Sequence, residues 1–106
     1  MFKLCFYVPL EALETVKAAV FATGAGRIGD YQECCWVSIG NGQFRPLASA
    51  SPAIGARGEL TTVAEAKVEM VCEKHQLKAA VAAMMAAHPY EEPAWQCWPV
   101  MTWEDL

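Results

Sequence analysis

The sequence predicts an α+β protein with a ferredoxin-like sandwich of order β-α-β-β-α-β, in which one antiparallel sheet carries two helices on one face. Two observations lead to this prediction. Segments with alternating and with helical spacing of apolar residues follow one another in that order. The two halves of the chain also repeat the same strand-helix-strand unit. The 106 residues have room for a single domain, which we assign to residues 1–106.

The first half supplies the first unit. Residues 2–8 alternate between an apolar face and a mixed face, which predicts a strand that ends at Pro9. Apolar residues at helical spacing predict a helix over 10–23, and Gly24-Ala25-Gly26 would end it. Alternation predicts the next strand at 33–39, followed by a turn at Gly40-Asn41-Gly42.

The second half follows a long insertion between the second and third strands. Residues 41–62 are rich in proline, glycine and small polar residues, so we expect an extended hairpin or an ordered loop there. A strand is predicted at 63–72, a helix at 76–87 and a last strand at 94–100. Both helices would then cover the same face of the sheet.

The opposite face of that sheet would be left open. Hydrophobic residues make up 55% of the chain, and four are tryptophans, more than a lone domain of this size can bury. We expect the open face to be half apolar, with Cys5, Tyr7, Trp36 and Val71 interspersed with Lys3, Lys67 and Glu69. Such a face favours self-association into a homo-oligomer.

Charge and cysteine content exclude several classes of function. Eight basic residues against twelve acidic ones give a net charge of −4, without a basic cluster, so nucleic acid and anionic membranes are unfavourable partners. The N-terminus does not resemble a signal peptide. The five cysteines are an odd number without a CxxC pair. These features predict a cytoplasmic protein with reduced cysteines.

Three motifs in order carry a specific resemblance that covers nearly the whole chain: GAGRIGDYQECCW, GQFRPLASASPAIG and AHPYEEPAW. Together they resemble the CutA-like domain inserted in many bacterial members of the NGG1-interacting-factor family, the YqfO type. The resemblance implies the CutA- and PII-like form of the fold, assembled as a trimer through the open sheet faces, and here as a stand-alone domain. The long members carry a dinuclear metal centre in a flanking domain that this chain is expected to lack, so their cyclohydrolase label is not transferred.

His88, at the end of the second predicted helix, has two interpretations. Its place in the last helical turn, just before Pro89, is that of a helix-terminating residue. Alternatively, His88 forms a polar pocket with Glu91 or Glu92, because imidazole and carboxylate groups are ordinary ligands of divalent metal ions. The resemblance favours this second interpretation. It also adds Cys34 as a candidate metal ligand, since CutA proteins are linked to divalent-cation tolerance.

The insertion supplies the other candidate site. Arg45, held between an aromatic residue and a proline, could reach an anionic ligand or another subunit. In PII-like trimers the corresponding excursion helps to form clefts between subunits. We therefore expect a ligand cleft in which Gly42 and Arg45 lie near the turn formed by Tyr90, Glu91 and Glu92. Adjacent glutamates point apart on a strand, so an acid-base pair is not favoured.

Three functions remain. The leading hypothesis is a non-enzymatic, oligomeric regulatory module, trimeric by resemblance, that binds a small molecule, a metal ion or a protein partner at intersubunit clefts. The second is a divalent metal-ion binding protein acting in metal tolerance. The third is a metal-dependent hydrolase acting on nucleotides. It is the least favoured, because the sequence shows neither a nucleophile-base pair nor a cluster of three metal ligands. The sequence identifies no cofactor beyond a candidate divalent metal ion.

Overall fold

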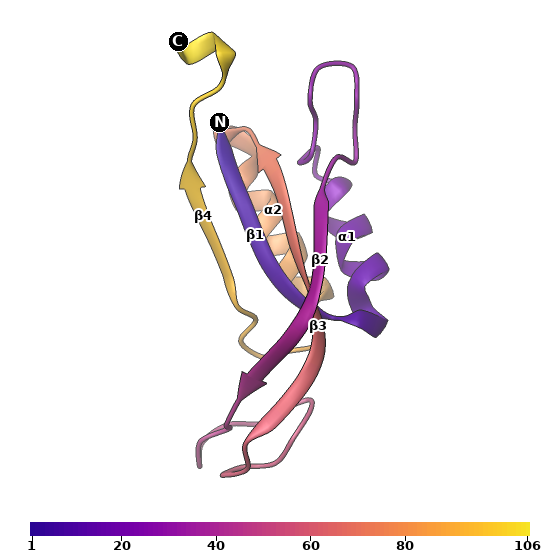
Figure 1. Ribbon diagram of the computed structural model, residues 1–106, viewed down its shortest axis with the longest axis vertical. Coiled ribbons are helices and arrows are strands. Elements are labelled where there is room, and N and C mark those ends of the chain that lie inside the picture. The colour runs from indigo at the N-terminus through magenta and orange to yellow at the C-terminus, as the bar shows by residue number, and fades with distance from the viewer.

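An antiparallel sheet with strand order β2-β3-β1-β4 organises the computed structural model, which describes residues 1–106 (Figure 1). The strands are β1 (Phe2–Pro9), β2 (Trp36–Phe44), β3 (Thr61–Cys72) and β4 (Trp95–Pro99). β3 pairs with β2 on one side and with β1 on the other, and β1 pairs with β4. This arrangement confirms the predicted ferredoxin-like fold class.

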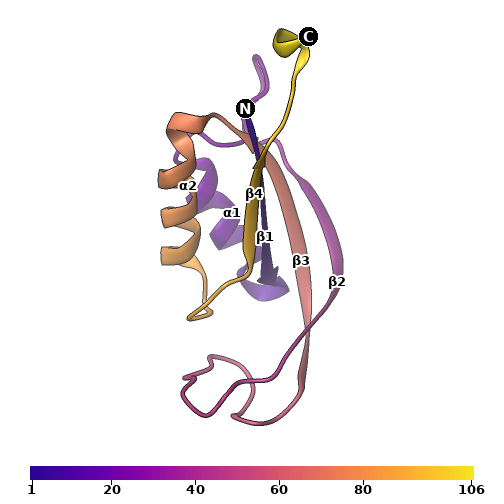
Figure 2. The same ribbon diagram turned by 90° about the vertical axis from the view of Figure 1, so that its left-hand side faces the viewer.

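Two helices cover one face of the sheet (Figure 2). A short 3-10 turn, η1 (Leu10–Ala12), leads into α1 (Leu13–Phe21), and α2 (Lys74–Ala87) connects β3 to β4. α2 begins two residues earlier than predicted because Glu73 and Gln76 form a reciprocal capping box at its start. A second 3-10 turn, η2 (Trp103–Asp105), ends the chain. No helix is both long and apolar enough to cross a lipid bilayer.

The hydrophobic core lies between the sheet and the helices. It contains twelve buried residues: Leu4, Phe6, Val8, Val16, Val20, Ala25, Ala66, Val68, Met70, Cys72, Ala80 and Met84. The alternation predicted for the first and third strands is therefore confirmed. Cys5 lies on the opposite face, as predicted, yet it is only 1% exposed, in a row that also holds Glu69 and Gln96.

The predicted turn at Gly40-Asn41-Gly42 is wrong. β2 continues through these residues to Phe44, because β3 starts at Thr61 and supplies a pairing partner for every one of them. The predicted start of this strand at Glu33 is also wrong. Residues 33–35 lie in the preceding loop, where the backbone N–H of Cys34 donates to the carbonyl of Gly26.

β2 and β3 extend beyond the end of β1 and form an arm, which we define as residues 41–64. Pro9 pairs with Glu65, so the arm has no part of β1 alongside it. Figure 2 shows the arm curving beneath the helices. Its tip, residues 45–60, is held by hydrogen bonds from the Gly58 N–H to the Pro46 carbonyl (2.7 Å) and from Arg57 Nε to the Ala50 carbonyl (2.6 Å). Residues 41–62, for which an extended hairpin or an ordered loop was expected, thus contain the ends of two paired strands and the loop between them.

Candidate functional site

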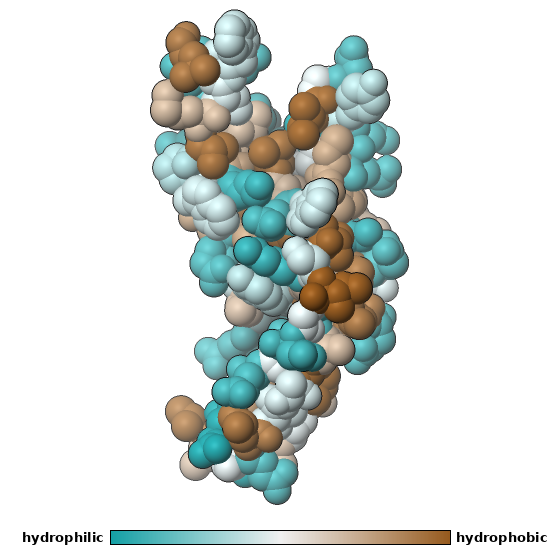
Figure 3. Space-filling model, in the orientation of Figure 1, coloured by the Kyte–Doolittle hydropathy of each residue, from teal (hydrophilic) through white to brown (hydrophobic).

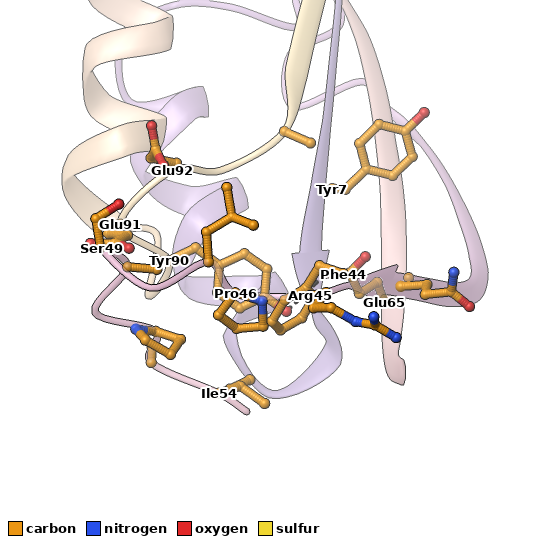
Figure 4. Close-up of a pocket in the computed structure, with 17 residues that line it drawn as sticks. Tyr7, Phe44, Arg45, Pro46, Ser49, Ile54, Glu65, Tyr90, Glu91 and Glu92 are labelled. Atoms are coloured by element: carbon orange, nitrogen blue, oxygen red, sulfur yellow. Dashed lines mark hydrogen bonds between the residues drawn. The ribbon is translucent and has the colours of Figure 1, made fainter. Parts of the chain in front are cut away.

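A cavity of about 670 Å³ lies between the arm and the α2–β4 turn, residues 88–94 (Figure 4). It has a size suited to a small organic ligand. All five residues predicted to bind a ligand line it: Gly42, Arg45, Tyr90, Glu91 and Glu92. Two of them come from the arm and three from the turn, so the fold brings together segments that are far apart in the sequence. The structure places the whole predicted set at one cavity.

His88 holds the turn against β1. The residue is 7% exposed, and Nε2 lies 2.7 Å from the carbonyl oxygen of Tyr7. Nδ1 accepts a hydrogen bond from the backbone N–H of Tyr90 at 3.1 Å. Because a carbonyl only accepts and an N–H only donates, the neutral ring carries its proton on Nε2. Both ring nitrogens are thus occupied by the backbone.

The predicted metal ligands His88, Glu91, Glu92 and Cys34 do not form a cluster. His88 lies beside Tyr7, toward the C-terminal end of β1. Cys34 is hydrogen-bonded to Gly26, whose N–H donates to Val71. Val71 pairs with Lys3, so Cys34 lies near the other end of β1. No group of three or more histidine, cysteine, aspartate or glutamate side chains is placed to hold a metal ion. The geometry therefore favours the first interpretation of His88, in which it ends α2 and connects the chain to the sheet.

Tyr90 joins the turn to β3. Its hydroxyl donates a hydrogen bond to Glu65 Oε2 at 2.9 Å, and its ring packs at a tilt against Phe44, with centroids 6.1 Å apart. Burial, together with the hydrogen bond to Glu65 and the charge of that carboxylate, raises the pKa of Tyr90 well above its usual value. Tyr90 is therefore a neutral hydrogen-bond donor throughout the physiological range.

Gly42 makes room for the Glu65 carboxylate. A β-carbon at position 42 would collide with the side chain of Glu65, whereas a β-carbon at Gly40, two residues earlier on the same strand, would meet open space. A side chain at position 42 would thus displace the acceptor of the Tyr90 hydrogen bond. Glycine thus leaves space for this carboxylate at a position that local sequence rules assign to a turn.

The remaining charged groups lie along the rim. Glu91 Oε1 accepts a hydrogen bond from the backbone N–H of Ser51 at 2.9 Å, which ties the tip of the arm to the turn. Glu92 and Arg45 are exposed, and neither takes part in a salt bridge. Figure 4 shows the guanidinium of Arg45 on the side of the cavity away from Glu91 and Glu92.

Sequence reasoning missed three contributors to this site. Alternation places Tyr7 on the open face of the sheet, but no sequence pattern singles out Glu65, and Ser51 lies within the predicted loop of residues 41–62. Tyr7 lies at the end of β1 near Ala94, where its N–H donates to the Ala94 carbonyl. The alternation of β3 could have placed Glu65 on the same face as Lys67 and Glu69, but no local pattern indicates that a tyrosine hydroxyl 25 residues away would reach it.

Similarity to known proteins supports the predicted resemblance. The chain is 52% identical over 92 residues to a Mycobacterium leprae protein named GTP cyclohydrolase 1 type 2 homolog, covering 87% of this chain and 24% of that protein. It is 48% identical over 98 residues to the protein of the same name in Bacillus subtilis, covering 92% of this chain and 26% of that protein. The chain thus spans about a quarter of the length of these relatives. No protein-family model matches the sequence.

Two solved structures share the fold of this chain. A Bacillus cereus protein related to NIF3 superposes with a TM-score of 0.82 at 33% identity, covering 95% of this chain and 26% of that one. The periplasmic divalent cation tolerance protein CutA from Archaeoglobus fulgidus superposes with a TM-score of 0.68 at 14% identity, covering 96% and 86% of the two chains. The second likeness concerns the fold alone. The fold is therefore CutA-like, and the sequence is related to one segment of a longer type of protein.

Proposed function

Since the chain is related to a quarter-length segment of those proteins and has the CutA-like fold, we propose that it is a non-enzymatic binding module. In this proposal it assembles with copies of itself and takes a small ligand in the cavity between the arm and the α2–β4 turn. The observation that carries the proposal is the convergence of the arm and the α2–β4 turn on one cavity. Two hydrogen bonds fix the turn: Tyr90 donates to Glu65 on β3, and the Ser51 N–H at the tip of the arm donates to Glu91.

The assembly part of the proposal rests on β2. This strand lies at the edge of the sheet, so one side of its nine-residue backbone has no pairing partner. Unpaired edges readily recruit another strand. Trp36 and Ile39 on this strand are 69% and 71% exposed. Figure 3, which views the open face of the sheet, shows hydrophobic side chains gathered over β2 beside a more hydrophilic centre. A second copy would cover this edge, and we propose a trimer.

We propose that the chain has no cyclohydrolase activity of its own, although its relatives carry that word in their names. The cavity is lined by three glutamates, one arginine and two tyrosines, without a cysteine or histidine. His88 behind it is fixed by two backbone hydrogen bonds, so it is not free to serve as a general base. Ser49 brings a hydroxyl to the lining, but its hydroxyl makes no hydrogen bond to a base that could activate it.

Two measurements test the proposal. Size-exclusion chromatography with multi-angle light scattering is expected to give three times the 11.6 kDa chain mass. Amide chemical-shift mapping with spermidine, GTP and zinc chloride as separate probes is expected to show shifts at cavity residues for at least one probe. A monomer at micromolar concentration would refute the assembly, and the absence of shifts at the cavity for all three probes would refute the binding site.

A further inference from the structure

We propose that the cavity between the arm and the α2–β4 turn selects a small organic cation, a compound that carries protonated amino groups, rather than a phosphate-bearing anion or a bare metal ion. This inference rests on the proposed binding function and adds the chemical class of the ligand. The arginine at the rim suggested an anionic ligand when only the sequence was considered. The other charged residues that line the cavity favour a cationic ligand instead.

The charge of the lining favours a cation. Three glutamates and one arginine line the cavity, Glu65, Glu91, Glu92 and Arg45, which leaves a net formal charge of −2. Arg45 lies on the far side from Glu91 and Glu92 in Figure 4, and no salt bridge neutralises these carboxylates. The protein as a whole carries −4. An anion entering this cavity would be repelled both locally and at long range.

The aromatic lining favours an organic cation over a metal ion. Tyr7, Phe44 and Tyr90 all line the cavity, and the rings of Phe44 and Tyr90 meet at 56°. Aromatic faces attract ammonium groups and pack against the carbon chain between them. Leu47 and Ile54 add apolar surface from the tip of the arm. A cavity of about 670 Å³ also greatly exceeds the space that one metal ion fills.

Besides their charge, the three carboxylates have unused hydrogen-bond acceptor positions for N–H donors. Glu65 and Glu91 each accept one intramolecular hydrogen bond, through Oε2 and Oε1 respectively, and Glu92 accepts none. Acceptor capacity is therefore left on all three groups, since an ionised carboxylate has about four acceptor positions. Charge-assisted hydrogen bonds from ammonium groups would use this capacity.

The test is a set of calorimetric titrations with spermidine at low ionic strength, in which two variants shift the affinity in opposite directions. Glu92→Gln removes a negative charge from an exposed side chain without hydrogen bonds, so the fold is unaffected, and spermidine binding is expected to weaken about two- to fivefold. Arg45→Gln removes the one positive charge and is expected to tighten binding by a similar factor. Asp30→Asn, in the loop at the opposite end of the sheet, changes the net charge as Glu92→Gln does and should leave the affinity unchanged.

The opposite pattern would overturn the inference. Weaker spermidine binding in Arg45→Gln, or a loss in Asp30→Asn equal to that in Glu92→Gln, would contradict a cation site in this cavity. Shift mapping separates this failure from that of the proposed function. Shifts at cavity amides with GTP but not with spermidine would refute the cation while keeping the binding site, whereas no shifts there with any probe would refute both.

Discussion

The hydroxyl of Tyr90 donates to the carboxylate of Glu65 across 2.9 Å and so joins the turn after α2 to the strand that carries the arm. These residues lie 25 positions apart in the sequence, on either side of α2. Glu65 is half-buried, and Gly42 on the neighbouring strand leaves the space in which its carboxylate lies. The contact therefore connects three segments and defines one wall of the cavity.

Replacing Tyr90 by phenylalanine should destabilise the protein by about 1–2 kcal/mol, because Glu65 loses its hydrogen-bond donor in a half-buried position. The matched control is Tyr31→Phe, since Tyr31 is 74% exposed and its hydroxyl makes no hydrogen bond. Urea unfolding followed by circular dichroism measures both. Equal stability of the two variants would show that the Tyr90 hydrogen bond contributes nothing.

The Tyr90 contact should also make stability depend on alkaline pH. The pKa of Tyr90 is raised in the folded protein by burial and by Glu65, whereas a tyrosine in the unfolded chain titrates near about 10. A raised pKa contributes stability that is complete below the unfolded value and declines as the pH rises above it. The stability difference between the native protein and Tyr90→Phe should therefore shrink from pH 8 to pH 11 in urea titrations. A constant difference would contradict this assignment.

Gly42 and Gly40 offer a matched pair on one strand. Gly42→Ala should cost about 1–3 kcal/mol because its methyl group collides with Glu65, while Gly40→Ala, which meets open space, should change stability by less than about 0.5 kcal/mol. Thermal or urea unfolding distinguishes the two. Combining Gly42→Ala with Glu65→Ala should remove the clash, so the double variant should cost less than the sum of the single ones.

His88→Ala should destabilise the protein by about 2–4 kcal/mol, because the carbonyl of Tyr7 and the N–H of Tyr90 each lose a partner at a buried ring. His75→Ala, at an exposed position near the start of α2, is the control and should be nearly neutral. Calorimetry with zinc chloride adds a second readout. Zinc affinity that falls in His88→Ala but not in His75→Ala would restore the metal interpretation.

If the free edge of β2 holds the copies together, a positive charge placed on this strand should weaken the assembly. Ile39→Lys places an ammonium group at a 71% exposed position on this edge and should lower the mass found by light scattering. Ile28→Lys introduces the same change at a 57% exposed position outside the sheet. It should leave the mass unchanged. An unaltered oligomer in Ile39→Lys would show that another surface holds the copies together.

Alternation and helical spacing of apolar residues predicted the core strands and the helices, which depend mainly on neighbouring residues. Leu4, Phe6 and Val8 alternate and are all buried, and the capping box at Glu73 explains why α2 begins before its first predicted residue. β2 was shortened in the prediction because Gly40-Asn41-Gly42 resembles a turn. The long partner strand overrides that signal, since each of these residues pairs with one on β3. Pairing between distant segments cannot be deduced from the composition of either one.

The sequence predicted which residues lie near one another at the candidate site, but not the contacts that they make. Unusual residues in the arm and in the HPYEEP turn identified Gly42, Arg45, Tyr90, Glu91 and Glu92, and all of them line the cavity. The role of His88 was undetermined because its acceptor is a backbone carbonyl 81 residues away, which carries no side-chain signature. The contact of Glu65 was not predicted either, because only the three-dimensional fold brings the hydroxyl of Tyr90 to its carboxylate.

None of the twelve core residues lies in the arm, although the arm provides much of the cavity wall. Substitutions in residues 41–64 can therefore reshape the cavity wall without removing any of the twelve core side chains. A lineage of such proteins could change ligands by altering this one segment while its foldability is preserved. Gly42 is the exception, because it leaves space for the Glu65 carboxylate and so links this segment to stability.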